Sequence, residues 1–113
     1  MGKKVILLEP TGHPGGMMVE GIVKDIRFGS SVVIGGIARE LYTEIERKYG
    51  REPQFDSFGW YAPYEPSVAE HIIEDFLRRE KNITIIRNQR IREENGVILS
   101  GTNIRKIILE DGR

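Results

Sequence analysis

The chain has 113 residues, and its 17 Lys plus Arg balance its 17 Asp plus Glu, so the formal net charge at pH 7 is +0. Proteins that bind nucleic acids or anionic membranes usually carry an excess of basic residues. This chain has no such excess, so we expect neither partner. The absence of cysteine excludes a disulfide scaffold, a thiolate zinc site and a cysteine nucleophile. The longest N-terminal apolar run, Val5 to Leu8, is too short for a membrane span or a signal peptide. We therefore expect one cytoplasmic domain over residues 1–113.

The first half of the chain predicts a strand and then a helix. Residues Lys4 to Leu8 form a compact, branched apolar run, typical of a parallel strand buried on both faces. A glycine-rich turn follows at residues 11–16. After Ile34 the spacing becomes helical, and Gly50 stands where a C-terminal cap is expected. The apolar face of this predicted helix comprises Ile34, Ile37, Ala38, Leu41, Tyr42 and Ile45.

Residues 50–66 form an irregular segment that is rich in proline, glycine and aromatic residues. Its aromatic residues are Phe55, Phe58, Trp60, Tyr61 and Tyr64. Two interpretations stay open: these side chains line a substrate site or bind a partner, or they anchor the segment to the core. A second helix is expected after Ser67, which has Glu70 at capping-box spacing, and it ends near Arg79.

The last third of the chain has strand patterns. We expect strands over residues 83–87, 97–100 and 104–110, with turns at residues 94–96 and 101–103 and an extension of the first strand over 89–93. Together these elements predict an α/β fold that has a short parallel sheet, two helices and an antiparallel β-meander from about residue 83 to the end.

Two features of the N-terminal segment suggest a dinucleotide site. Glu9 follows a short apolar strand, at the sheet edge where a carboxylate accepts hydrogen bonds from adenosine ribose hydroxyls. The pair Gly15 and Gly16 lets backbone amides approach a phosphate or ring without interference from Cβ, although the pair taken alone favours a tight turn.

The run Glu-Pro-Thr-Gly-His-x-Gly-Gly-Met at residues 9–17 and the run Val-x-Gly-Gly-x-Ala at 33–38 resemble the FAD-dependent oxidoreductases. That resemblance covers nearly the whole chain and implies a partial Rossmann-like FAD/NAD(P)-binding fold. It implies FAD as the cofactor, with the ribose held by Glu9. It further implies that Gly15, Gly16 and Met17 lie against the flavin nucleotide, and that a backbone group near Ile91 contacts the adenine.

The chain departs from that family pattern in its phosphate-binding turn. A G-x-G-x-x-G turn should precede the acidic residue by roughly 20 positions, but only eight residues precede Glu9, and the motif occurs nowhere. We therefore expect an internal fragment of a larger flavoprotein that binds FAD in its full-length context. A missing first strand would expose the edge beside Lys4 to Leu8, so we also expect a homo-oligomer.

The remaining residues assign no catalytic group. His13 and His71 are interpreted as solvated side chains, and two separated histidines without cysteine predict no metal site. The predicted function is a part of an FAD-dependent oxidoreductase that acts on an unknown small-molecule substrate and is not catalytic alone. The alternative is a non-catalytic interaction or assembly domain that uses the aromatic segment and the exposed sheet edge.

Overall fold

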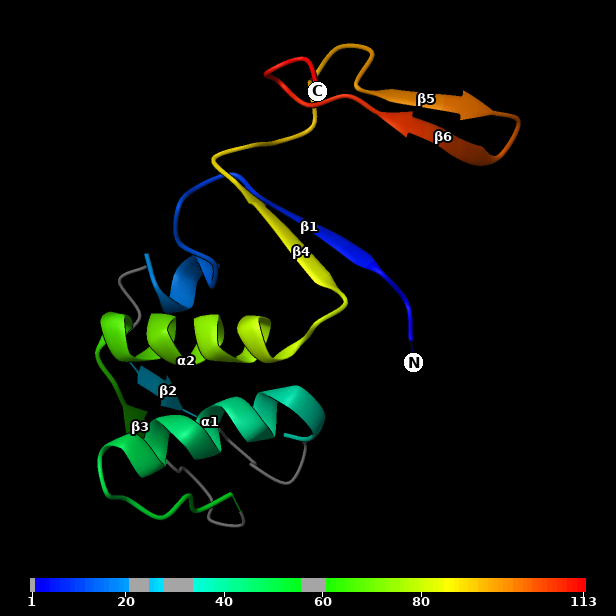
Figure 1. Cartoon of the computed structure of the whole chain (residues 1–113). Coiled ribbons are helices and arrows are strands. Elements are labelled where there is room, and N and C mark those ends of the chain that lie inside the picture. Colours follow the sequence, from blue (N-terminus) through cyan, green and yellow to red (C-terminus); the bar gives the residue numbers. More distant parts are fainter. Residues whose placement is uncertain (1, 21–24, 28–33, 56–60) are drawn as a thin grey trace. The chain divides into compact units, whose positions relative to one another are not determined.

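Figure 1 shows a computed structural model of the chain, which describes residues 2–20, 25–27, 34–55 and 61–113. It confirms an α/β architecture with two helices and with both parallel and antiparallel strands. By contacts the chain groups into a first unit, Met1–His13 with Glu80–Arg113, and a second unit, Pro14–Arg79. The expectation that residues 1–113 form a single domain stays a prediction.

The elements in chain order are β1 (Val5–Glu9), the 3-10 turn η1 (Gly16–Met18), β2 (Asp25–Arg27), α1 (Gly36–Lys48), β3 (Tyr61–Pro63), α2 (Pro66–Arg79), β4 (Ile83–Arg87), β5 (Val97–Ser100) and β6 (Asn103–Ile107).

The first unit contains the predicted parallel pairing. Strands β1 and β4 lie side by side, in register from Val5 opposite Ile83 to Glu9 opposite Arg87 (Figure 1). The expectation that β1 is buried on both faces is wrong, since the Ile6 side chain is 67% exposed. The reason is that β1 pairs only with β4 in the described part of the chain, so this two-stranded sheet covers little apolar surface.

The antiparallel part begins later than predicted. Residues 83–87 belong to the parallel pair, and the first antiparallel contact of this part is a bridge between Ile91 and Leu109. Beyond the bridge, β5 and β6 form a hairpin, with Val97 opposite Ile107.

The β5–β6 hairpin has one apolar face because of a bulge. Ile98 pairs with Lys106 but Leu99 pairs with Ile104, which leaves one residue of β6, Arg105, unpaired. This extra residue shifts the alternation of side chains, so that the side chains of four apolar residues share one face. We call these residues the hairpin face: Val97, Leu99, Ile104 and Ile107. Their exposed fractions lie between 41 and 62%.

The second unit is built on the packing of α1 against α2, with β2 pairing antiparallel to β3. Its core is formed by the buried side chains Ile45, Tyr64, Ala69 and Ile72. The predicted cap is confirmed, since Gly50 follows α1 with φ of 66° and donates its N–H to the Arg47 carbonyl at 3.0 Å. Two residues of the predicted apolar face of α1 do not fit, because Ile37 is 74% exposed and Ala38 is exposed as well.

Helix α2 begins earlier than predicted. Its first residue is Pro66, and the backbone N–H groups of Val68 and Ala69 donate to the Glu65 carbonyl. Ser67 therefore lies inside the first turn, and the capping box assigned to it is wrong. Proline is favoured at the first helical position because its fixed φ suits the helix and the missing N–H has no partner there in any case.

The described aromatic residues of the 50–66 segment anchor it to the core. Phe55 is buried against Ile34 and Tyr42, and Tyr64 belongs to the core of the second unit. The anchoring interpretation is therefore confirmed for these two residues. Phe58 and Trp60 lie outside the described residues, and only the backbone of Tyr61 is described, in β3.

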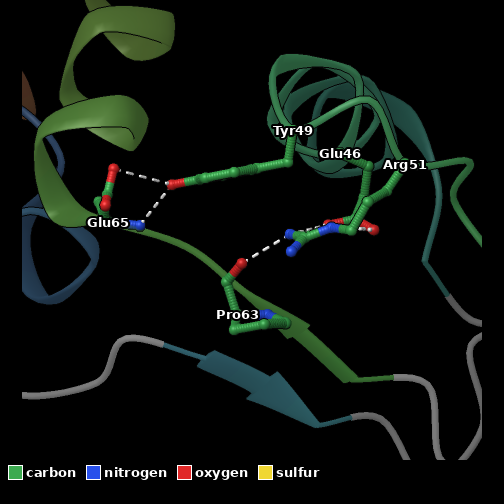
Figure 2. Close-up of polar contacts among 5 residues, drawn as sticks. All are labelled: Glu46, Tyr49, Arg51, Pro63 and Glu65. Atoms are coloured by element: carbon green, nitrogen blue, oxygen red, sulfur yellow. Dashed lines mark hydrogen bonds and ion pairs between the residues drawn. The ribbon is translucent and has the colours of Figure 1, made fainter.

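A polar cluster fixes the end of α1 to the segment before α2 (Figure 2). Glu46 is only 2% exposed, and its carboxylate accepts hydrogen bonds from Arg51 Nε and Nη2. Arg51 Nη2 also donates to the Pro63 carbonyl at 2.6 Å. The Tyr49 hydroxyl accepts the Glu65 N–H at 2.8 Å. The sequence analysis did not identify this cluster, which stabilises the fold of the second unit.

Candidate functional site

The candidate site lies where the carboxyl ends of β1 and β4 meet. The loop after β1 is tied to the end of β4 by three hydrogen bonds. Asn88 N–H donates to the Thr11 carbonyl at 3.1 Å, and Gln89 N–H donates to the Glu9 carbonyl at 3.2 Å. Arg87 Nη1 donates to the Gly12 carbonyl at 2.9 Å. This edge of a parallel sheet is the place where α/β folds bind ligands.

The Glu9 carboxylate is held by one of its two oxygens. Oε1 accepts the Thr11 N–H at 2.8 Å and the Thr11 hydroxyl at 2.9 Å. Oε2 accepts no hydrogen bond from the described residues. Glu9 is half-buried. The two hydrogen bonds from Thr11 restrict the orientation of its carboxylate, and Oε2 is the oxygen without a partner in the described part of the chain.

Ile91 has an unpaired backbone. In its bridge to Leu109 the two hydrogen bonds are made by the flanking residues: Arg92 N–H donates to the Ile108 carbonyl, and Glu110 N–H donates to the Arg90 carbonyl. In such a pair the N–H and C=O of the central residue point away from the partner segment. Neither group of Ile91 has a hydrogen-bond partner among the described residues.

Gln89 is a third residue of interest, two positions before Ile91 in the sequence. Its side-chain Oε1 is buried and has no hydrogen-bond partner among the described residues. A buried, unpaired polar atom costs about 1–3 kcal/mol, and such atoms in native proteins call for a physical reason. The Gln89 residue as a whole is half-buried.

The three predicted flavin-contacting residues belong to the second unit. Gly15 has φ of 134°, and an added Cβ would lie 2.8 Å from Ile73 Cδ1, so its lack of a side chain serves packing. Gly16 has φ of 52° and open space where a Cβ would be, and Met17 is exposed. Contact of these residues with a flavin stays a prediction, with Gly16 and Met17 offering the accessible surface.

The histidines are placed as expected. Both His13 and His71 are exposed, and His71 Nδ1 lies 3.0 Å from the Ser67 carbonyl oxygen, within its own helix. Across the described ranges, no cluster of three or more His, Asp or Glu side chains is suited to hold a metal ion. In the same ranges, no helix has the length and apolar character that crossing a membrane requires.

The five predicted site residues thus divide between the units. Glu9 and Ile91 belong to the first unit, and Gly15, Gly16 and Met17 belong to the second. The sequence analysis missed Thr11, Arg87 and Gln89. A local signal existed only for Thr11, since a hydroxyl residue two positions after a carboxylate commonly forms a side-chain turn.

Comparison with protein families assigns the chain to a family. The model of the family described as FAD dependent oxidoreductase matches residues 1–113, the full length of this chain. No curated protein and no solved structure matches the chain.

Proposed function

Because the chain belongs to the FAD-dependent oxidoreductase family, we propose that its first unit forms the adenosine end of an FAD site in a Rossmann-like fold. The observation that carries this proposal is the Glu9 carboxylate at the carboxyl edge of the β1–β4 pair, with Oε1 held by Thr11 and Oε2 without a hydrogen bond from the described residues. The chain would contribute this part of the site within a larger oxidoreductase and would not be catalytic alone.

Glu9 suits the ribose of the cofactor. The 2′ and 3′ hydroxyls of adenosine are adjacent donors, and an ionised carboxylate is the strongest acceptor among protein side chains. Its place at the carboxyl end of a parallel strand is the position from which a ribose is bound in dinucleotide folds. The unoccupied Oε2 supplies the acceptor without breaking a contact of the folded protein.

Ile91 and Gln89 suit the adenine. The Watson–Crick edge of adenine pairs a ring acceptor with an amino donor, which matches the N–H and C=O of one extended residue such as Ile91. The unsatisfied amide of Gln89 offers a further polar group, and pairing it with the base would remove its desolvation cost.

The remainder of the cofactor would be held elsewhere. The chain has no G-x-G-x-x-G turn for the pyrophosphate. We propose that the loop containing Gly15, Gly16 and Met17 contacts the flavin nucleotide, supported by the open side of Gly16 and the exposure of Met17. The bound flavin would supply the redox chemistry, while these residues bind and orient it.

A cytoplasmic location is proposed with this function, consistent with the absence of cysteine.

The test is a titration of the purified chain with FAD, followed by quenching of flavin fluorescence. Glu9→Gln keeps the shape of the side chain but removes its charge, and we expect binding to weaken by about 10-fold, the typical effect of one hydrogen bond to a charged group. Glu93→Gln is the matched control, because Glu93 is exposed in the same unit and its carboxylate makes no hydrogen bond or ion pair with the described residues. Equal affinities of the two variants, or no binding of FAD by the unmodified chain, would refute the proposal.

The hairpin face favours a second proposal, self-association. It presents four exposed apolar side chains in two cross-strand pairs, Val97 with Ile107 and Leu99 with Ile104, so two copies can bury this surface by stacking these faces. Leu99→Lys on this face should then convert a dimer to a monomer in sedimentation equilibrium. Ile98→Lys, on the opposite face, should leave the dimer intact. A chain that is monomeric at high micromolar concentration would contradict this proposal.

A further inference from the structure

We infer that Thr11 is a positioning residue for the FAD ribose: it fixes one oxygen of the Glu9 carboxylate so that the other is presented to the ligand. This inference rests on the proposed function of Glu9. It goes beyond the family assignment, because it concerns a residue that touches the carboxylate and not the cofactor.

The local geometry is specific to Thr11. Its N–H and its hydroxyl both donate to the same atom, Glu9 Oε1, at 2.8 and 2.9 Å. Two donors on one oxygen fix the rotation of the carboxylate about its terminal bond, which is otherwise broad. Oε2 is thereby left without a partner among the described residues, in a defined direction.

The Thr11 hydroxyl is itself oriented. The His13 N–H donates to Thr11 Oγ1 at 3.0 Å, so this oxygen acts as an acceptor toward the backbone. Its single hydrogen can go to Glu9 Oε1 at 2.9 Å or to the His13 carbonyl at 3.3 Å. The shorter contact to an ionised oxygen is the stronger, because hydrogen bonds to charged groups are roughly twice as strong as neutral ones. The hydroxyl hydrogen therefore points to Glu9.

The loop that carries Thr11 is anchored to the neighbouring strand. The Thr11 carbonyl accepts the Asn88 N–H, and the next carbonyl, that of Gly12, accepts Arg87 Nη1. Asn88 itself has a positive φ of 53°, a conformation held here at the end of β4. Thr11 is thus a rigid part of the sheet edge, and a carboxylate held by it loses little rotational freedom when a ligand binds.

The experiment compares three threonine variants by isothermal titration calorimetry, with ADP as the probe of the adenosine end. Thr11→Val keeps the branched shape but removes the hydroxyl, and we expect ADP binding to weaken by roughly 5- to 10-fold. Thr11→Ser retains the hydroxyl and should bind within about twofold of the unmodified chain. Thr84→Val is the matched control, since Thr84 is an exposed residue of β4 whose hydroxyl makes no hydrogen bond with the described residues, and this variant should bind normally.

A double-mutant cycle separates positioning from a general loss of structure. If Thr11 acts through the carboxylate, Thr11→Val should have little further effect in a Glu9→Ala background, which lacks the oxygen that Thr11 holds. An equal loss in both backgrounds would overturn the inference, as would normal ADP binding by Thr11→Val. Thermal unfolding of each variant shows whether the first unit remains folded, and the Thr11→Ser result decides the case if Thr11→Val does not fold.

The outcomes also separate this inference from the proposed function. Weak binding by Glu9→Gln together with normal binding by Thr11→Val would retain the ribose site and reject the role of Thr11. Normal binding by Glu9→Gln, or no binding of ADP by the unmodified chain, would reject the ribose site itself and the role of Thr11 with it.

Discussion

Arg51 holds the carboxylate of Glu46 inside the second unit, with Nη2 lying 2.6 Å from Oε1 and Nε within 3.2 Å of both oxygens. Glu46 is almost fully buried, while the Arg51 side chain is about one-third exposed. Removing one partner of a buried pair leaves an uncompensated charge, which is far more costly than the loss of a surface ion pair. Arg51→Met should therefore lower the free energy of unfolding by about 2–4 kcal/mol.

Urea unfolding followed by circular dichroism measures this effect. Arg47→Met is the matched control, because Arg47 pairs with Glu44 on the exposed side of the same helix. That variant should change the free energy of unfolding by less than about 1 kcal/mol. Equal losses for the two variants would show that burial of Glu46 has no special importance.

Gly15 and Gly16 should differ on substitution by alanine. Gly15→Ala brings a Cβ against Val19 and Ile73, so it should cost about 2–4 kcal/mol of stability from overpacking together with an unfavourable φ. Gly16→Ala meets open space and should cost only the backbone strain, about 1 kcal/mol. Thermal unfolding of the two variants measures the difference. A reversed order would contradict the packing described for Gly15.

The pH dependence of stability should report on Tyr42. Burial raises the pKa of its phenol, and the charge that Tyr64 gains on ionisation raises this pKa further. The unfolded chain then loses the Tyr42 proton at lower pH than the folded chain does. The difference between the two pKa values gives Tyr42 a contribution to the free energy of unfolding. This contribution is fully present below the ordinary tyrosine pKa of about 10, and it is lost as the pH rises through the pKa of Tyr42 in the folded chain.

Urea unfolding between pH 8.5 and 11 tests this. Tyr42→Phe removes the titrating group, so its free energy of unfolding should decline less steeply above about pH 10 than that of the unmodified chain. Parallel curves for the two proteins would show that Tyr42 does not carry the effect.

The elements of the fold were largely predictable because each depends on local pattern. The helical spacing from Ile34 to Ile45 and the position of Gly50 predicted α1 and its end. The same spacing placed Ile37 on the buried face, yet Ile37 is exposed, because periodicity gives the side of a helix and not what lies opposite it. The start of α2 was misplaced because the capping-box spacing at Ser67 was preferred over the proline immediately before it.

The candidate site was predictable only in part. Glu9 stood out because an acidic residue at a strand end is a known position for ribose binding. The burial of Glu46 was not predictable, because its partner Arg51 lies beyond the helix end and an acidic residue in a helix is normally solvated. The unpaired backbone of Ile91 depends on its register with Leu109, 18 positions away, and no local pattern specifies that register.

The central claim, that the first unit binds the adenosine end of FAD, is tested most directly by comparing ADP with FMN. Both ligands carry phosphate, but only ADP contains the adenosine that Glu9 and Ile91 are proposed to hold. We predict that ADP displaces FAD from the purified chain in a fluorescence competition assay at a lower concentration than FMN does, because FMN can occupy only the flavin end of the proposed site. Displacement by FMN without displacement by ADP would contradict the account.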